Sequence, residues 1–129
     1  MNTVPFPAMK RPLIAILRGL KPEEAEGVVS VLIEHGMTAI EIPLNSPDWQ
    51  RSIGDTVAAF GTRALIGAGT VLTENLVDEV ADLGGRLVVT PNTDETVMPS
   101  LFSAVGKIAR LVMAARTPAA IAHQSALFC

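Results

Sequence analysis

Cysteine, histidine and aromatic residues are scarce in this sequence, and each scarcity excludes a class of protein. The 129 residues include one cysteine, Cys129, which excludes an internal disulfide and fits a reducing compartment. Aromatic residues make up 4%, and the 10 basic residues are dispersed along the chain. Neither stacking nor charge therefore favours a nucleic-acid partner.

Long apolar runs, a signal-peptide pattern and metal-ligand spacing are also missing. Charges, glycine or proline interrupt every apolar stretch before it could span a bilayer, and the run that begins at Leu13 stops at Arg18. Neither histidine, His35 or His123, belongs to a cluster with metal-ligand spacing. The sequence contains no nucleophile elbow. We expect a cytoplasmic domain with no membrane partner and no metal.

A repeat of strand and helix patterns predicts the fold class. Apolar strand-like runs occupy residues 13–17, 38–42, 64–66 and 87–90, with starts roughly two dozen residues apart, about one βα unit. Between them, amphipathic segments predict helices that begin near Pro22, Ser46 and Thr73. Strands that are apolar throughout are typical of a parallel sheet covered by helices.

Such a repeat fits either a doubly wound sheet or part of a (βα)₈ barrel. Functional-looking residues follow every predicted strand, and a barrel brings all of these turns to one mouth. We therefore predict an α/β fold that is a partial (βα)₈ TIM barrel of about four units, over residues 12–98. We expect residues 99–129 to form a divergent, mostly helical tail in which 119–128 could form a short helix and no fifth strand is evident. Just before this tail, residues 93–98 could begin a helix.

Glu41 is the strongest candidate for a catalytic residue. It lies within an apolar strand, and Pro43 predicts that the strand ends just beyond it. A buried carboxyl is costly unless it is paired or protonated, and burial raises its pKa toward the range useful in proton transfer. The structural alternative is an ion pair with Arg18 or Arg63.

Four further residues are candidates for substrate binding. Arg18 follows the first strand, and its guanidinium suits a carboxylate or a phosphate, unless it only pairs with Glu41. Thr70 ends the segment Gly67-Ala-Gly-Thr70, which could approach a ligand or could form a tight turn without one. Pro91 and Asn92 could face the same mouth, although Asn92 could simply cap a helix.

Four segments in register resemble the KDPG/KHG aldolase family. They are Pro12-Leu-Ile-Ala-Ile-Leu-Arg-Gly19, Ala39-Ile-Glu-Ile-Pro-Leu-Asn-Ser-Pro47, Leu65-Ile-Gly-Ala-Gly-Thr-Val71 and Val89-Thr-Pro-Asn92. The Pro-Leu-Asn-Ser-Pro continuation is similar to the 2-dehydro-3-deoxy-6-phosphogalactonate aldolase branch.

The resemblance implies a homotrimeric class I aldolase of galactonate catabolism that needs no cofactor. It cleaves a ketoacid sugar phosphate to pyruvate and glyceraldehyde 3-phosphate through a lysine Schiff base. Glu41 is then the acid/base, Arg18 and Thr70 bind the ketoacid end, and Pro91 and Asn92 line the pocket.

The family's imine lysine, in a stretch similar to Leu-Lys-Phe-Phe-Pro, has no counterpart here. Lys10, Lys21 and Lys107 occupy other positions, and the resemblance fades after about residue 98. We expect a truncated or frameshifted chain that has no aldolase activity alone. The alternatives are a non-catalytic half-barrel that persists by association, and a module that binds pyruvate or another small ketoacid.

Overall fold

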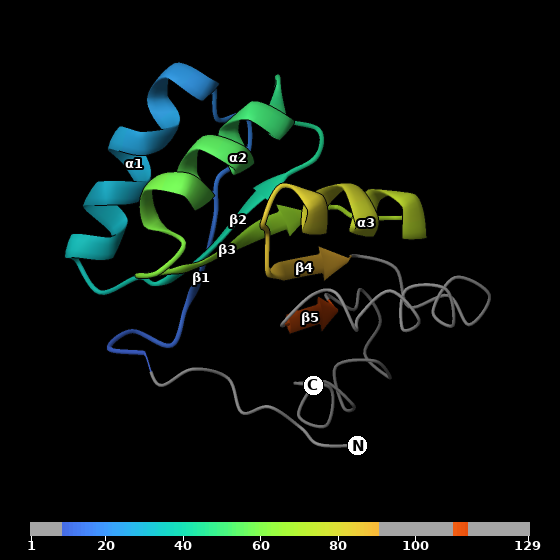
Figure 1. Cartoon of the computed structure of the whole chain (residues 1–129). Coiled ribbons are helices and arrows are strands. Elements are labelled where there is room, and N and C mark those ends of the chain that lie inside the picture. The colour runs from blue at the N-terminus through green and yellow to red at the C-terminus, as the bar shows by residue number, and fades with distance from the viewer. Residues whose placement is uncertain (1–8, 91–109, 114–129) are drawn as a thin grey trace.

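Residues 9–90 and 110–113 are described by the computed structural model. Their strands are β1 (Ile14–Ile16), β2 (Ala39–Pro43), β3 (Leu65–Gly69), β4 (Leu87–Thr90) and β5 (Arg110–Met113). Their helices are α1 (Pro22–Glu34), α2 (Trp49–Phe60) and α3 (Glu74–Asp82) (Figure 1). The alternation of strand and helix through β4 confirms the predicted βα repeat.

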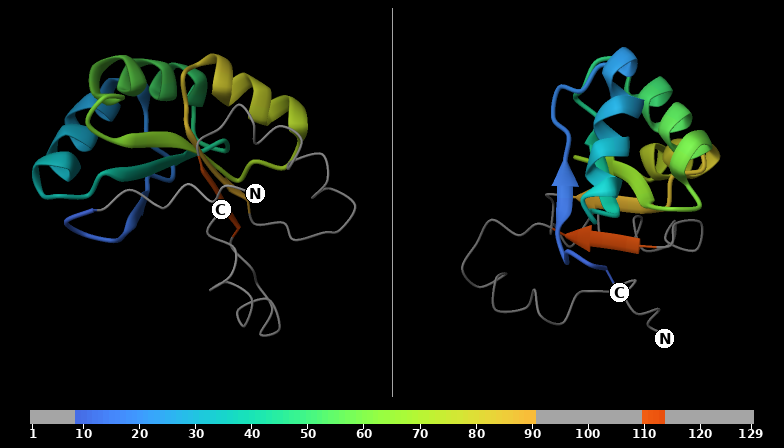
Figure 2. Two further views of the ribbon diagram at one scale, coloured as in Figure 1. Left: turned by 60° about the horizontal axis from the view of Figure 1, so that its bottom comes forward. Right: turned by 90° about the vertical axis from the view of Figure 1, so that its left-hand side faces the viewer.

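The order of the strands identifies the sheet as part of a barrel. The sheet runs β1-β2-β3-β4-β5, and every neighbouring pair is parallel. All three helices lie on the same side of it (Figure 2). A doubly wound sheet would reverse its strand order and carry helices on both faces. The observed arc confirms the partial barrel expected from the sequence.

The strand β5 corrects the expectation that the tail contains no fifth strand. Arg110–Met113 pair with Leu87–Thr90 in register, from Leu87 with Arg110 to Thr90 with Met113. Four residues carry too little pattern to be recognised alone, whereas the edge of β4 supplies backbone partners that hold them extended. The helices expected over residues 93–98 and 119–128 lie outside the described residues.

The apolar core lies between the sheet and the helices and has two parts. One part joins alternate residues of the strands to α2 and α3: Ile42, Ala68 and Val88 with Ile53, Val77 and Val80. The other part joins them to α1: Ala15, Ile40 and Ile66 with Val29 and Ile33. Because side chains alternate along a strand, Glu41 and the missing side chains of Gly67 and Gly69 belong to the opposite, inner face.

The helix α2 begins three residues later than the sequence predicted. It starts at Trp49 rather than at Ser46, because the Ser46 N–H donates to the Pro43 carbonyl (2.9 Å) and turns the chain first. Asp48 follows in the left-handed region, with φ of +47°. In the part of the chain that the structure describes, no helix is long and apolar enough to cross a membrane.

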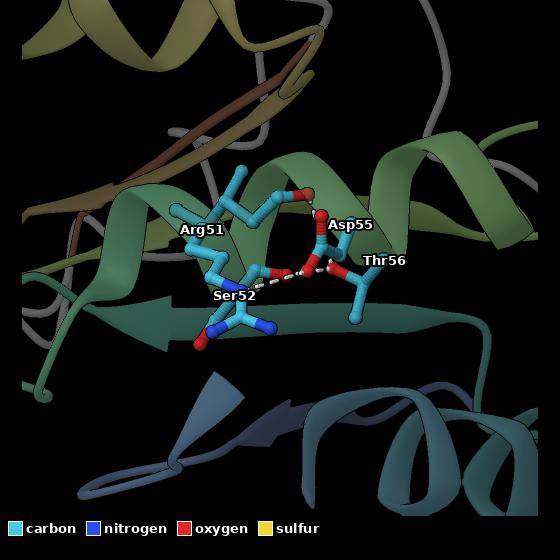
Figure 3. Close-up of polar contacts among 5 residues, drawn as sticks. Arg51, Ser52, Asp55 and Thr56 are labelled. Atoms are coloured by element: carbon cyan, nitrogen blue, oxygen red, sulfur yellow. Dashed lines mark hydrogen bonds and ion pairs between the residues drawn. The ribbon is translucent and has the colours of Figure 1, made fainter. Parts of the chain in front are cut away.

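The buried side of α2 contains two hydroxyl groups, those of Ser52 and Thr56, which differ in their hydrogen bonding (Figure 3). The Thr56 hydroxyl donates to the Ser52 carbonyl (2.6 Å). The Ser52 hydroxyl is also buried, yet it has no hydrogen-bond partner among the described residues. An unpartnered buried hydroxyl destabilises the folded state.

The substitution Ser52→Ala should therefore raise the free energy of unfolding by about 1 kcal/mol, because it removes this hydroxyl and alanine favours a helix. Urea denaturation measures the change. The control is Ser30→Ala in α1, where the hydroxyl is not fully buried and donates to Glu34 (3.4 Å). That variant should gain no more than the helix propensity, about 0.5 kcal/mol. An equal gain at both positions would contradict the account of Ser52.

Candidate active site

Glu41 is the middle residue of β2, between two paired strands. In the register of the sheet it lies opposite Ile16 of β1 and Gly67 of β3. Its carbonyl accepts a hydrogen bond from the Leu17 N–H (3.0 Å), so its backbone is fixed on both sides. Its side chain, on the inner face, is only 4% exposed.

The Glu41 carboxyl is buried without the partners that would stabilise a negative charge. Its Oε2 atom has no hydrogen-bond partner, and neither Arg18 nor Arg63 forms an ion pair with it among the residues described. Burial raises the pKa of Glu41 from 4.5 to about 7, against the opposing effect of the Arg18 charge. The structure thus disfavours the alternative of a structural ion pair.

Arg18 lies in the exposed turn after β1, close enough for its charge to act on Glu41. The next residue, Gly19, donates its N–H to the Ser46 hydroxyl (3.0 Å). Ser46 is buried and follows β2, so this bond ties the turn that carries Arg18 to the strand that carries Glu41. Sequence reasoning missed this role, because a serine before a proline and an aspartate predicts a helix start.

The segment Gly67-Ala-Gly-Thr70 is mostly strand, which corrects its interpretation as a turn. Residues 67–69 pair with β2, and only Thr70 begins the turn. An added Cβ at Gly69 would collide with the Glu41 carboxyl. Thr70 has φ of +58°, a conformation rarely adopted by β-branched residues and often retained at functional sites.

The structure therefore brings together three of the five predicted site residues. Glu41, Arg18 and Thr70 gather at the carboxyl ends of β1, β2 and β3. Pro91 and Asn92 lie outside the described residues. Lys107 does too, whereas Lys10 packs its aliphatic stem beside Gly36, after α1, and Lys21 precedes α1.

This arrangement suits proton transfer next to a bound anion. A carboxyl with a pKa of about 7 can both accept and donate a proton near neutral pH. The exposed Arg18 guanidinium can hold a carboxylate with two hydrogen bonds. Among the described residues, no group of three or more His, Cys, Asp or Glu could hold a metal ion.

Comparisons with known proteins agree with this geometry. The family model "KDPG and KHG aldolase" matches residues 7–124, beyond the point where the quoted motifs end. A probable 2-dehydro-3-deoxy-6-phosphogalactonate aldolase of Rhizobium meliloti (strain 1021) is 63% identical over 98 residues, which are 76% of this chain and 46% of that protein. The 2-dehydro-3-deoxy-6-phosphogalactonate aldolase of Escherichia coli (strain K12) is 54% identical over 89 residues, 69% of this chain and 43% of the relative.

A solved structure described as native KDPGal has the same architecture. It superimposes with a TM-score of 0.73 at 49% identity, over 81% of this chain and 49% of that one. The chain thus spans about half the length of the curated relatives that it matches.

The raised pKa of Glu41 predicts that the protein loses stability as the pH rises. Between pH 4.5 and about 7, the folded state keeps the proton that the unfolded chain releases. The contribution of Glu41 to the free energy of unfolding should therefore be highest below pH 4.5 and should fall by about 3 kcal/mol as the pH rises through 7, at ~1.4 kcal/mol per unit. Urea denaturation at a series of pH values measures the slope.

The control for this slope is Glu41→Gln, whose amide does not titrate. Subtracting its profile removes the contributions of the titratable groups that both proteins share. Parallel profiles for the two proteins would mean that Glu41 titrates normally.

Loss of the Ser46 hydroxyl should loosen the turn that carries Arg18. In Ser46→Ala, the Gly19 N–H loses its acceptor, at a cost of about 1 kcal/mol. Its amide hydrogen should then exchange several-fold faster, as NMR would measure. The Gly84 amide, which donates to the Ala81 carbonyl (2.9 Å) at the end of α3, is the internal control. If both amides exchange as they do in the parent chain, the bond to Ser46 does not hold the turn.

Proposed function

The chain belongs to the KDPG and KHG aldolase family, and we propose that it carries the acid/base and ketoacid-binding residues of a 2-dehydro-3-deoxy-6-phosphogalactonate aldolase. The buried Glu41 carboxyl, with a pKa of about 7, is the observation that carries the proposal. The two relatives that bear this enzyme name, at 63% and 54% identity, support the choice of substrate.

Glu41 is proposed to move the proton of the cleavage step. Aldol cleavage of a 4-hydroxy-2-oxo acid breaks the C3–C4 bond after a base removes the proton of the C4 hydroxyl. The electron pair of that bond passes toward C2, and an aldehyde is released. The remaining fragment, at the oxidation level of pyruvate, takes up a proton at C3. A group with a pKa near 7 can perform both transfers, as base and then as acid.

Arg18 and Thr70 are proposed to hold the carboxylate end of the substrate. Arg18 is exposed and forms no ion pair within the described part of the chain, so its N–H donors are accessible to a ligand. Thr70 is the residue after Gly69, and Gly69 lies against the Glu41 carboxyl. A carboxylate bound between them would place the neighbouring C2 and C3 atoms toward Glu41.

The cleavage step also requires a group at C2 that accepts the electron pair of the broken bond. In a class I aldolase, a lysine forms an imine at C2, and this imine accepts the electron pair. Lys10 packs beside Gly36, in the loop between α1 and β2. This loop lies at the opposite end of the strands from Thr70. None of the three lysines, Lys10, Lys21 and Lys107, matches the position of the family's imine lysine, and we propose that the 129-residue chain binds the ketoacid but forms no imine with it. The Schiff-base route is proposed from the family resemblance, and a cytoplasmic location from the single cysteine.

A second candidate is a half-barrel that acts by associating with another chain. The first strand and its approach expose two large apolar side chains, Leu13 (55% exposed) and Ile16 (59% exposed). Because β1 is an edge of the described sheet, these side chains are available to a partner. This observation also supports a homo-oligomer, which size-exclusion chromatography would detect.

Pyruvate is the probe for the proposed site. Calorimetric titration should show that pyruvate binds the 129-residue chain and that Arg18→Ala weakens binding about 10- to 100-fold, the value of a charge-assisted hydrogen bond. Arg63→Ala is the matched control, because Arg63 is an exposed arginine before β3, at the other end of the strands. It should bind pyruvate as tightly as the parent chain does.

Borohydride treatment in the presence of pyruvate separates binding from imine formation. We expect no covalent adduct by mass spectrometry. An adduct on any lysine would overturn the expectation that this chain forms no imine. Undetectable pyruvate binding, or equal weakening in both arginine variants, would instead overturn the assignment of Arg18.

A further inference from the structure

The two glycines of β3 face the same side of the sheet but adjoin different neighbours. Gly67 and Gly69 are two residues apart, so both alternate along the strand with residues whose side chains point to the opposite face. The residues that alternate with them, Ile66 and Ala68, pack in the core beneath the helices. The inner face of β3 is therefore bare at two successive positions, next to the strand that carries Glu41.

At Gly67 the neighbour is the backbone of β4. An added Cβ would lie 2.6 Å from the Leu87 carbonyl carbon and 2.7 Å from its nitrogen, closer than real Cβ atoms approach. Leu87 is paired with Gly67 in the sheet, so its backbone cannot move without breaking that pairing. Glycine at this position allows β3 and β4 to pair.

At Gly69 the neighbour is a side chain. The three atoms nearest to an added Cβ are the three carboxyl atoms of Glu41, and the Cβ would collide with all of them. A carboxyl at the end of a rotatable side chain can move away, whereas a paired strand cannot. A methyl group at Gly69 would thus displace the carboxyl and leave the strands in place.

We propose that Gly69 is a positioning residue that reserves the space for the Glu41 carboxyl on the inner face, whereas Gly67 serves only the pairing of β3 with β4. The catalytic meaning of this placement rests on the proposed function, because Glu41 is the acid/base only if that function is correct. The placement itself is a property of the folded chain and is testable without activity.

Displacement of the carboxyl has a direction that can be measured. The raised pKa of Glu41 arises from burial, and the Arg18 charge opposes it. A carboxyl pushed from the inner face toward solvent or toward Arg18 loses part of its desolvation. Its pKa must then fall toward the ordinary value of 4.5.

The test compares the same substitution at the two glycines of one strand. In the 129-residue chain labelled with ¹³C-glutamate, Gly69→Ala should lower the pKa of Glu41 by about one unit or more, with the resonance assigned from Glu41→Gln. Its urea transition should remain cooperative. Gly67→Ala should instead lower the urea midpoint sharply. Gly54→Ala in α2 is the control, because its Cβ would meet only Leu83 Cδ2 at 3.7 Å, an ordinary contact.

A double substitution keeps the test decisive if Gly69→Ala unfolds the protein. In Glu41→Ala/Gly69→Ala the carboxyl is gone, so the added methyl group has room and the urea midpoint should recover relative to Gly69→Ala alone. Glu41→Ala should give no such recovery with Gly67→Ala. A folded Gly69→Ala with an unchanged Glu41 pKa would overturn the proposal, and so would an unfolded one that Glu41→Ala fails to rescue.

The outcomes also separate this proposal from the proposed function. If the pKa of Glu41 falls in Gly69→Ala but the parent chain does not bind pyruvate, Gly69 positions a carboxyl that serves another reaction. If pyruvate binds and the pKa is unchanged, the ketoacid site stands and Gly69 has no part in placing its carboxyl.

Discussion

The close approach of β3 to the strands on either side is the constraint on which the rest of the structure depends. At Gly67 there is no room for a single carbon atom beside the backbone of β4, and at Gly69 there is none beside the Glu41 carboxyl. Every residue of β2 and β3 is buried, so these two strands have little room to shift. The position of the Glu41 carboxyl therefore depends on the absence of a side chain at Gly69. The same strand, β3, leads directly into Thr70.

Folding and chemistry place opposite demands on Glu41. A neutral carboxyl is easier to bury than a charged one, so folding favours the protonated form. Proton transfer requires that the charged form also be reached near neutral pH, and the nearby Arg18 charge makes it less costly. Near neutral pH, the protonated and the charged form of the Glu41 side chain are thus both populated. A salt bridge in the same place would stabilise the fold more simply, but it would fix the carboxyl in its charged form.

The sequence predicted the repeat, the barrel-type sheet and the importance of Glu41, because these depend on local patterns. Apolar runs bounded by turns specify parallel strands, and a lone glutamate in such a run is conspicuous. The predictions were wrong where the conformation of a residue depends on a contact with a residue distant in sequence. Ser46 has the sequence of a helix cap but bonds to Gly19, and Gly67 and Gly69 look like a turn but lie in a strand. The short strand β5 depends on the edge of β4 in the same way.

After β1, each strand of the described sheet pairs with the described strand that precedes it in the sequence. During synthesis, which proceeds from the N-terminus, every new strand therefore meets an edge that is already formed. Pairings between segments that are nearer in sequence carry a smaller loop-closure entropy than pairings between distant segments. The described sheet can thus be completed by extension at one edge, one βα unit at a time, at the pace of the ribosome.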